Sequence, residues 1–130
     1  MKRKYYVPKG GLPTQDQRLY APACFTTSYA VIPAHSMVDI VVSFLPLWKD
    51  TRAWILARPL TGFAETFSQL IVEIAPGGGS SEPEPEDGAE AILFCVAGEL
   101  TLTIDDQEHV LEPGGYAYVS PKSLWSIYNT

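Results

Sequence analysis

The chain has 130 residues, a length that fits one domain with one sizeable core. Its apolar fraction of 46% and aromatic fraction of 12% are those of a globular protein and argue against a disordered one. The net charge of −6 argues against a nucleic-acid binder, which needs a basic surface for phosphates, and disfavours docking on an anionic membrane.

The chain carries no visible targeting segment. Its basic N-terminus is followed by no apolar region of the secretory type, and no apolar run reaches transmembrane length. Cys24 and Cys95 are the only cysteines, too few for a disulfide framework, and the apolar run around Cys95 predicts a buried free thiol. We therefore expect a cytoplasmic protein.

Residues 1–22 are predicted to form an extended N-terminal arm, because four prolines and glycines interrupt any regular pattern before Pro22. The arm holds the one dense basic cluster, Lys2, Arg3 and Lys4, which reads as a solvated terminus or as a functional arm. Neither a linker nor an internal repeat follows. Residues 23–130 are accordingly predicted to form one domain.

The domain is predicted to be all-β, because no segment has a convincing helical period. Region 33–50 is apolar but interrupted by Pro46, so it fits a short strand or a loop. Turns are expected at 98–99, 105–106 and 113–115. Many short strands separated by turns indicate a sandwich or barrel. The expected strands are 24–32, 51–58, 67–75, 91–98, 99–105, 107–112, 115–120 and 124–129.

The stretch at 77–90 raises the question of a metal site. Three glycines at 77–79 predict a flexible turn that leaves the strand ending at residue 75. The next residues alternate prolines with carboxylates, a pattern typical of an extended, solvated loop. The alternative is an acidic lip that binds a hard cation such as magnesium, calcium or manganese. The carboxylates are Glu82, Glu84, Glu86, Asp87 and Glu90.

The second half of the chain resembles the cupin family, whose members are double-sheet jelly-roll barrels. The first cupin motif, G-x5-H-x-H-x4-E-x6-G, fits without gaps when Gly78 and Gly98 take the two glycine positions. The histidine positions then fall on Glu84 and Glu86, and the glutamate position falls on Ala91. The frame of the motif is present, but its ligand identities are not.

The second cupin motif, G-x5-P-x-G-x2-H-x3-N, fits from Gly114 to Asn129, and only these two residues match outright. Ser120 takes the proline position and Trp125 takes the histidine position. Alanine supplies no donor atom, and an indole N–H cannot ligate a metal through a lone pair. The resemblance therefore implies that this chain lacks the cupin metal site, with Trp125 filling the space instead.

A narrower resemblance is carried by "FSQLIVEIAPGGG", "GAEAILFCVAGELTL" and "LEPGGYAYVSPKSLWSIYNT". These segments are similar to the N-terminal, metal-free half of (S)-ureidoglycine aminohydrolases, two-cupin enzymes of allantoin catabolism. That family hydrolyses ureidoglycine to ureidoglycolate and ammonia, with manganese in its C-terminal cupin. The resemblance implies that a second cupin domain is missing here, that no catalytic residue is carried by this chain, and that the protein is a homo-oligomer.

These features are compatible with three alternative functions. The first is a non-catalytic cupin half of such an enzyme, inactive alone. The second is a stand-alone, metal-free module that binds a small molecule at the barrel mouth, with Trp125, Tyr116 and Tyr118 as pocket residues beside the acidic lip. The third is a metal-independent isomerase or epimerase, which ranks last because the histidines, His35 and His109, form no His–Asp pair in the sequence.

Overall fold

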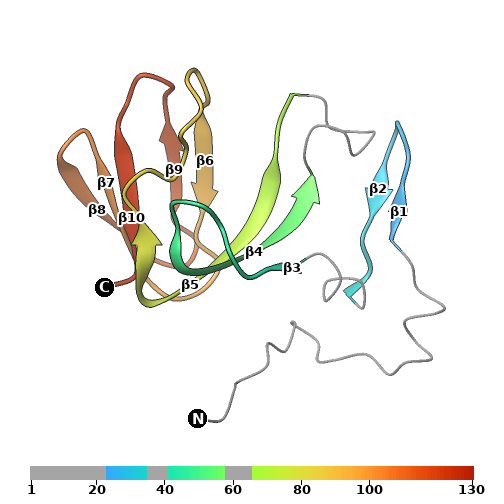
Figure 1. The fold of residues 1–130 in the computed structure, drawn as a ribbon, viewed down its shortest axis with the longest axis horizontal. Helices are drawn as coiled ribbons and strands as arrows, with labels where there is room; N and C mark the ends of the chain where they lie inside the picture. Colours follow the sequence, from blue (N-terminus) through green and yellow to red (C-terminus); the bar gives the residue numbers. More distant parts are fainter. Residues whose placement is uncertain (1–22, 35–40, 58–65) are drawn as a thin grey trace, which may run out of the picture. The chain divides into compact units, whose positions relative to one another are not determined.

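A computed structural model describes residues 23–34, 41–57 and 66–130, and contains no α-helix within them (Figure 1). The predicted arm at 1–22 and His35 lie outside the described residues. The all-β prediction is confirmed. The ten strands of the described residues are β1 (Cys24–Phe25), β2 (Ala30–Val31), β3 (Val41–Val42), β4 (Lys49–Ala57), β5 (Gln69–Ser80), β6 (Ala91–Phe94), β7 (Leu100–Ile104), β8 (Gln107–Leu111), β9 (Tyr116–Val119) and β10 (Trp125–Tyr128).

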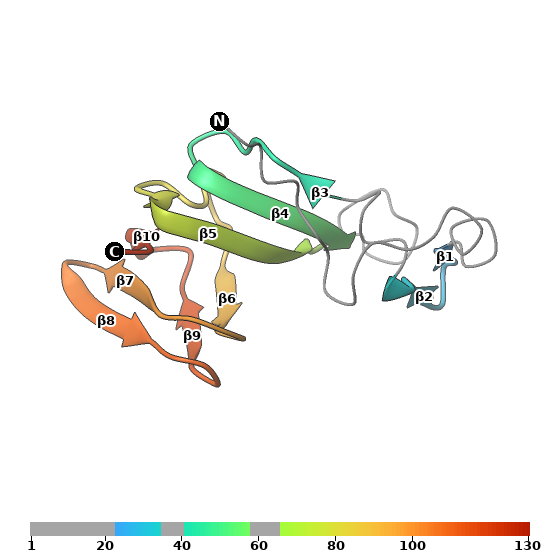
Figure 2. The same ribbon diagram turned by 90° about the horizontal axis from the view of Figure 1, so that it is seen from below.

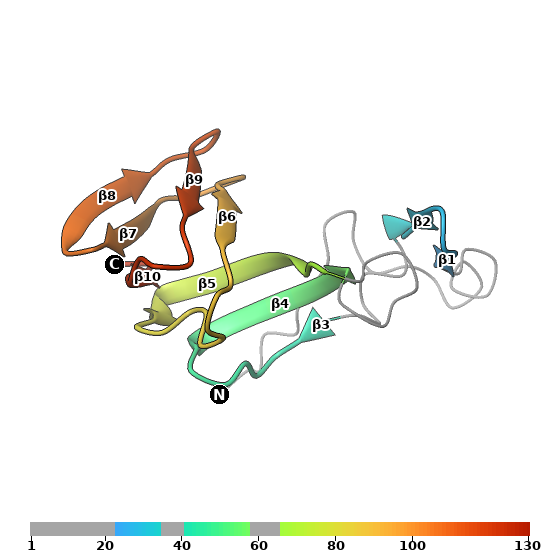
Figure 3. The same ribbon diagram turned by 90° about the horizontal axis from the view of Figure 1, so that it is seen from above.

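The strands form three sheets. A six-stranded sheet has the order β3-β4-β5-β10-β7-β8, while β1 pairs with β2 and β6 pairs with β9. Figures 2 and 3 show β6 beside β9 and β7 beside β8 from opposite sides. No helix among the described residues is long and apolar enough to span a membrane.

The chain divides into two compact units. Of the described residues, unit 1 holds 23–34, 41–42, 53–57 and 66–72, and unit 2 holds 43–52 and 73–130. In unit 1, β3 pairs with β4 through Val41 and Trp54, and Trp54 is buried. Unit 2 contains both of the cupin-like motifs, so the candidate site is described within it.

The core of unit 2 joins side chains from its two sheets. Leu102, Leu111 and Ile127 come from the large sheet, and Cys95 follows directly after β6. Leu93 and Ala117, from the β6–β9 ribbon, pack against them. The buried free thiol predicted at Cys95 is confirmed.

The β7–β8 hairpin follows directly from its sequence. Leu100, Leu102 and Ile104 alternate along β7 and face the core, as expected for a strand with one buried side. The two turn residues, Asp105 and Asp106, have φ angles of 47° and 66°. A two-residue hairpin turn of this kind needs positive φ at both positions, which aspartate tolerates better than most residues. The predicted turn is confirmed.

The predicted turn at the three glycines is wrong. β5 continues through Pro76 and the glycines to Ser80, where Gly78 and Gly79 are buried. A Cβ on Gly78 would lie 2.6 Å from the carbonyl oxygen of Lys49. A Cβ on Gly79 would collide with the carbonyl oxygen of Ile127. Gly78 and Gly79 are therefore positions where neighbouring backbones approach closely, not a flexible exit from the strand.

Two further strand predictions differ from the structure. The run 24–32 is a short hairpin, because Thr26 and Tyr29 close a turn: the Thr26 amide donates to the Tyr29 carbonyl at 2.9 Å, and the Tyr29 amide donates to the Thr26 hydroxyl at 2.9 Å. β6 ends at Phe94, before the predicted end at residue 98. In region 33–50, β3 is a short strand, and β4 begins at Lys49.

Candidate functional site

The acidic loop between β5 and β6 is exposed and is tied down at its start. The amide of Glu82 donates to the hydroxyl of Ser80 at 3.1 Å, and that hydroxyl donates to the carbonyl of Leu47 at 2.6 Å. Glu84 and Glu86 are exposed, and the Glu86 amide donates to the Glu84 carboxylate at 3.1 Å. This bond lies within the loop and shapes it locally.

Glu90, the last carboxylate of the stretch, is held by a tyrosine. The hydroxyl of Tyr118 in β9 donates to its Oε2 at 2.7 Å. The bond stabilises the neutral phenol and raises the pKa of Tyr118 above its ordinary value, with desolvation and the Glu90 charge acting in the same direction. The end of the acidic loop is thereby fixed to the β6–β9 ribbon.

The position of Glu90 explains why it cannot stand in for the glutamate of the cupin motif. Ala91, at the motif position, is half-buried and starts β6, whose residue Leu93 packs against the core. Side chains alternate along a strand, so Glu90 lies on the other face. Its bond to Tyr118 confirms that placement. A shift of one residue has moved the carboxylate from the inner face to the outer one.

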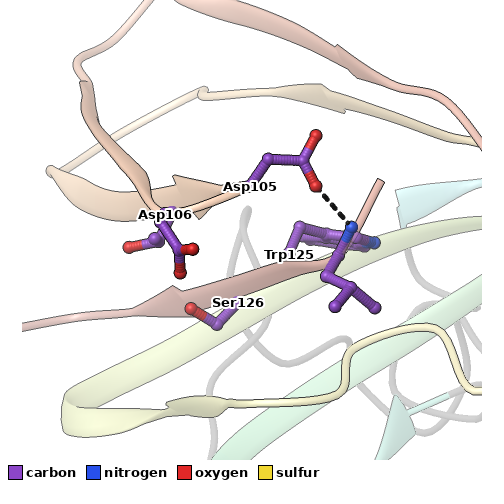
Figure 4. Close-up of a pocket in the computed structure, with 6 residues that line it drawn as sticks. Asp105, Asp106, Trp125 and Ser126 are labelled. Carbon is purple, nitrogen blue, oxygen red and sulfur yellow. Dashed lines mark hydrogen bonds between the residues drawn. The ribbon is translucent and has the colours of Figure 1, made fainter. Parts of the chain in front are cut away.

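Trp125 begins β10 and packs against the unit 2 core, as predicted for a core-filling aromatic. It also lines a shallow, open depression of about 260 Å³ beside the β7–β8 turn (Figure 4). The carboxylate of Asp105 points toward this depression but accepts a hydrogen bond from the Leu124 amide at 2.9 Å. The other lining residues are Thr103, Asp106, Leu124 and Ser126.

The sequence did not indicate this depression, because Asp105 and Asp106 were identified only as a turn. The structure separates the predicted pocket residues from it. Tyr116 and Tyr118 lie on β9, are exposed, and are not among its lining residues. His109 is exposed on β8, where it pairs across the hairpin with Leu102. Trp125 and the two tyrosines therefore do not form one described pocket.

The residues at the cupin ligand positions do not fit a metal ion. Glu84 and Glu86 lie in the exposed loop, and Ala91 and Trp125 offer no lone pair. Within residues 23–34, 41–57 and 66–130, no three His, Cys, Asp or Glu side chains are grouped so that they could hold a metal. The described side chains at the cupin ligand positions therefore do not supply the donor set of a cupin metal site.

The glycine and asparagine positions of the motifs, by contrast, lie at close backbone contacts. The Asn129 amide donates to the Gly78 carbonyl at 3.0 Å, and its side-chain amide donates to the Ile74 carbonyl at 2.8 Å. The Gly114 amide donates to the Cys95 carbonyl at 2.8 Å. Gly78, Gly114 and Asn129 thus keep their backbone contacts, while the metal-ligand positions of both motifs hold other residues.

Comparison with known proteins agrees with this reading. The family model described as "Cupin domain" matches residues 70–130, the part of the chain that holds both motifs. Residues 70–130 are thus similar to a cupin domain, and we call them the cupin domain below. The all-β fold with a jelly-roll core in unit 2 is the fold expected for it.

Three known proteins are similar to this chain. (S)-ureidoglycine aminohydrolase from Escherichia coli strain K12 is 28% identical over 90 residues, which are 69% of this chain and 34% of that protein. The crystal structure of a Pseudomonas aeruginosa protein named as glyoxylate-induced has a TM-score of 0.77 and 53% identity, and covers 99% of this chain and 46% of that one. The crystal structure of the E. coli protein Ylba has a TM-score of 0.67 and 22% identity, over 91% of this chain and 47% of that one.

The coverage and sequence identity differ among the three proteins. The chain spans about a third of the curated relative and just under half of the two crystallised proteins. The likeness to Ylba concerns the fold alone, because the identity is 22%. The likeness to the P. aeruginosa protein extends over nearly the whole chain, including residues before the cupin domain.

Proposed function

We propose that this chain is the N-terminal, non-catalytic cupin half of an enzyme like (S)-ureidoglycine aminohydrolase. In the complete enzyme, a second cupin domain would bind manganese and convert ureidoglycine to ureidoglycolate and ammonia. This half would contribute packing against the second cupin and a contact for a cytoplasmic homo-oligomer.

The observation that supports the proposal is a contrast within one domain. Positions of the cupin motifs that hold the backbone keep their residues, while the metal-ligand positions do not. Gly78 and Asn129, which match the motifs, are hydrogen-bonded to each other. Trp125, at a ligand position, packs into the core instead of presenting a donor atom. A cupin that keeps its fold without ligands fits a supporting role beside a catalytic copy, and the similarity to the E. coli aminohydrolase names the chemistry of that copy.

The 130-residue chain should release no ammonia from (S)-ureidoglycine beyond a no-protein control, with or without manganese. A coupled assay of ammonia under both conditions measures this. Saturable release by the purified chain would contradict the proposal, because it would place catalysis in a domain that has no metal ligands.

A second measurement examines the acidic loop directly. A thermal-shift titration with manganese should leave the melting temperature unchanged, because Glu84 and Glu86 are exposed and the cupin ligands that would complete a site are absent. If micromolar manganese instead raised the melting temperature and Glu84→Ala abolished that increase, the loop would bind a cation.

The complete reading frame distinguishes this proposal from the alternative, a stand-alone binding module. Continuation into a second cupin motif with intact histidines, and manganese-dependent ammonia release by the longer product, are the expected results. A stop codon directly after Thr130 would favour the binding module. The depression beside Trp125 would then be the place to look for a small ligand.

A further inference from the structure

The acidic loop between β5 and β6 contains the one aspartate of the chain that is followed by glycine, Asp87 before Gly88. Both residues are exposed. The Ala89 amide donates to the Glu86 carbonyl at 3.3 Å, so Asp87 and Gly88 form the centre of a turn. An aspartate before glycine has a reaction of its own. Its side-chain carboxyl can be attacked by the amide of the next residue, because that residue has no side chain to stand in the way.

The surroundings of Gly88 leave its amide open to this reaction. Gly88 has a φ angle of 82°, and a Cβ built on it would meet nothing within 4 Å, so the space around the turn is open. The neighbouring Ala89 amide is occupied by the hydrogen bond that closes the turn, whereas no hydrogen bond joins the Gly88 amide to another described residue. The attacking nitrogen is therefore not tied to an acceptor in the part of the chain that the structure describes.

The other described aspartates are held more firmly. Asp50 belongs to β4 and precedes a β-branched residue. Asp105 lies in the β7–β8 turn, where its carboxylate accepts a hydrogen bond from the Leu124 amide and its own amide donates to the Leu124 carbonyl, both at 2.9 Å. Asp106 follows in the same turn and is itself followed by the first residue of β8. The sequence and the structure together single out Asp87.

We propose that Asp87–Gly88 is a modification site, at which the aspartate isomerises spontaneously to isoaspartate. The Gly88 nitrogen forms a bond to Cγ of Asp87, and the hydroxyl of the carboxylic acid leaves with the amide proton as water. The product is a cyclic succinimide. Water then adds to the main-chain carbonyl carbon of Asp87, and the bond from that carbon to the Gly88 nitrogen breaks. One water is lost and one is regained, so neither mass nor oxidation state changes.

The isomer lengthens the main chain between two fixed points. In isoaspartate the chain runs through Cβ and Cγ, which adds one carbon inside the turn. The loop is attached at its start, where the Glu82 amide donates to the Ser80 hydroxyl at 3.1 Å, and at its end, where the Tyr118 hydroxyl donates to Glu90 at 2.7 Å. The turn cannot keep its geometry with an additional atom, and we expect the change to stay within the loop and to leave the strand pairing of the cupin domain intact.

Storage of the purified 130-residue chain in neutral buffer at physiological temperature tests the proposal. Samples taken over several weeks are digested with a protease that cleaves before aspartate but not before isoaspartate, and the peptides are identified by mass spectrometry. Cleavage before Asp87 should decline with time, and the peptide that spans this position should include a form lighter by one water, the succinimide. Cleavage before Asp105 of the same molecules is the internal control and should not decline, because Asp105 is held by Leu124.

Two variants examine the two reacting groups. Gly88→Ala keeps Asp87 for the same digest and should slow the loss of cleavage, because the added methyl group crowds the attacking nitrogen; the new Cβ lies in open space, so the domain should still fold. Asp87→Glu keeps the charge of the loop but would have to form a larger ring, and its peptide should show no form lighter by one water. Circular dichroism verifies that both variants, and the stored chain, remain folded.

Three results would overturn the proposal. Cleavage before Asp87 could stay constant during storage, it could decline no faster than cleavage before Asp105, or it could decline equally fast in Gly88→Ala. The first would show that Asp87 does not isomerise, and the other two that the glycine turn is not what allows the reaction. None of these results depends on the ammonia assay or on metal binding, so this proposal and the proposed function can fail separately.

Discussion

Replacing Gly79 with alanine tests whether the glycine run of β5 is required by the strands beside it. In the structure, Gly79 pairs with Tyr128 of β10 and has a φ angle of 143°. An added Cβ would collide with the Ile127 carbonyl oxygen and lie 2.6 Å from Cδ1 of Tyr128. The carbonyl belongs to the backbone of β10, so it cannot move aside without disturbing the strand pairing.

Two contributions set the size of the effect. A non-glycine residue held in this region of φ costs on the order of 1–3 kcal/mol. Forcing an extra carbon into a filled space costs about 1–3 kcal/mol more. We therefore expect Gly79→Ala to lower the free energy of unfolding by roughly 2–6 kcal/mol, a large share of the ~5–15 kcal/mol of an ordinary domain.

Gly88→Ala is the matched control. Gly88 also has a positive φ, 82°, but a Cβ there would meet nothing within 4 Å. Its substitution should cost only the backbone strain of about 1–2 kcal/mol. Urea unfolding followed by tryptophan fluorescence measures both variants, because Trp48 and Trp125 pack against the core of unit 2. If the two variants differ by less than ~1 kcal/mol, the close approach of β5 and β10 is not what requires glycine.

Two other predictions concern the core and the ribbon. Ile127→Ala should lower the free energy of unfolding by about 2–4 kcal/mol, because Ile127 is 1% exposed at the centre of the core. Val110→Ala, on the exposed side of β8, should lower it by less than ~0.5 kcal/mol. Similar losses of unfolding free energy for the two variants would contradict a core centred on Ile127. Because the folded-state pKa of Tyr118 is raised, its contribution to stability should be fully present below its ordinary value near 10 and be lost as the pH rises through the folded-state pKa. Absorbance titration of the tyrosines should show one phenol that ionises at a higher pH than the others, and Glu90→Gln should lower its pKa toward the ordinary range. If Glu90→Gln leaves the titration curve unchanged, the Tyr118–Glu90 bond does not form in solution.

The parts of the fold that the sequence predicts well are those set by near neighbours in the chain. The β7–β8 hairpin is specified by the alternation from Leu100 to Ile104 and by the two aspartates of its turn. These signals are complete within about twelve residues. The glycines of β5 were misread for the opposite reason. Gly78 and Gly79 have no room for a Cβ because the backbone carbonyls of Lys49 and Ile127 approach them closely. Both carbonyls belong to residues that are distant in sequence.

The candidate site shows the same division. Alternation places Tyr116 and Tyr118 on one side of β9, but it does not say whether that side meets the core or the solvent. The structure shows the exposed side, and with it the bond from Tyr118 to Glu90. That bond depends on where the acidic loop returns to the ribbon, which the local sequence does not specify. The depression beside Trp125 was missed because its lining comes from the β7–β8 hairpin and the start of β10.

The loss of metal ligands without loss of the fold has a physical basis in these contacts. The residues that hold the backbone of the cupin domain act through main-chain groups or through the absence of a side chain, as Gly78 and Gly114 do. Ligand positions act only through their side-chain atoms, so Ala91 and Trp125 can occupy them while strand pairing continues at both places. A tryptophan that fills the vacated volume adds apolar contacts to the core. Ligand loss is therefore compatible with a stable domain, and the acidic stretch at 77–90 comprises a strand end that needs glycine followed by a solvated loop anchored to the ribbon by Glu90.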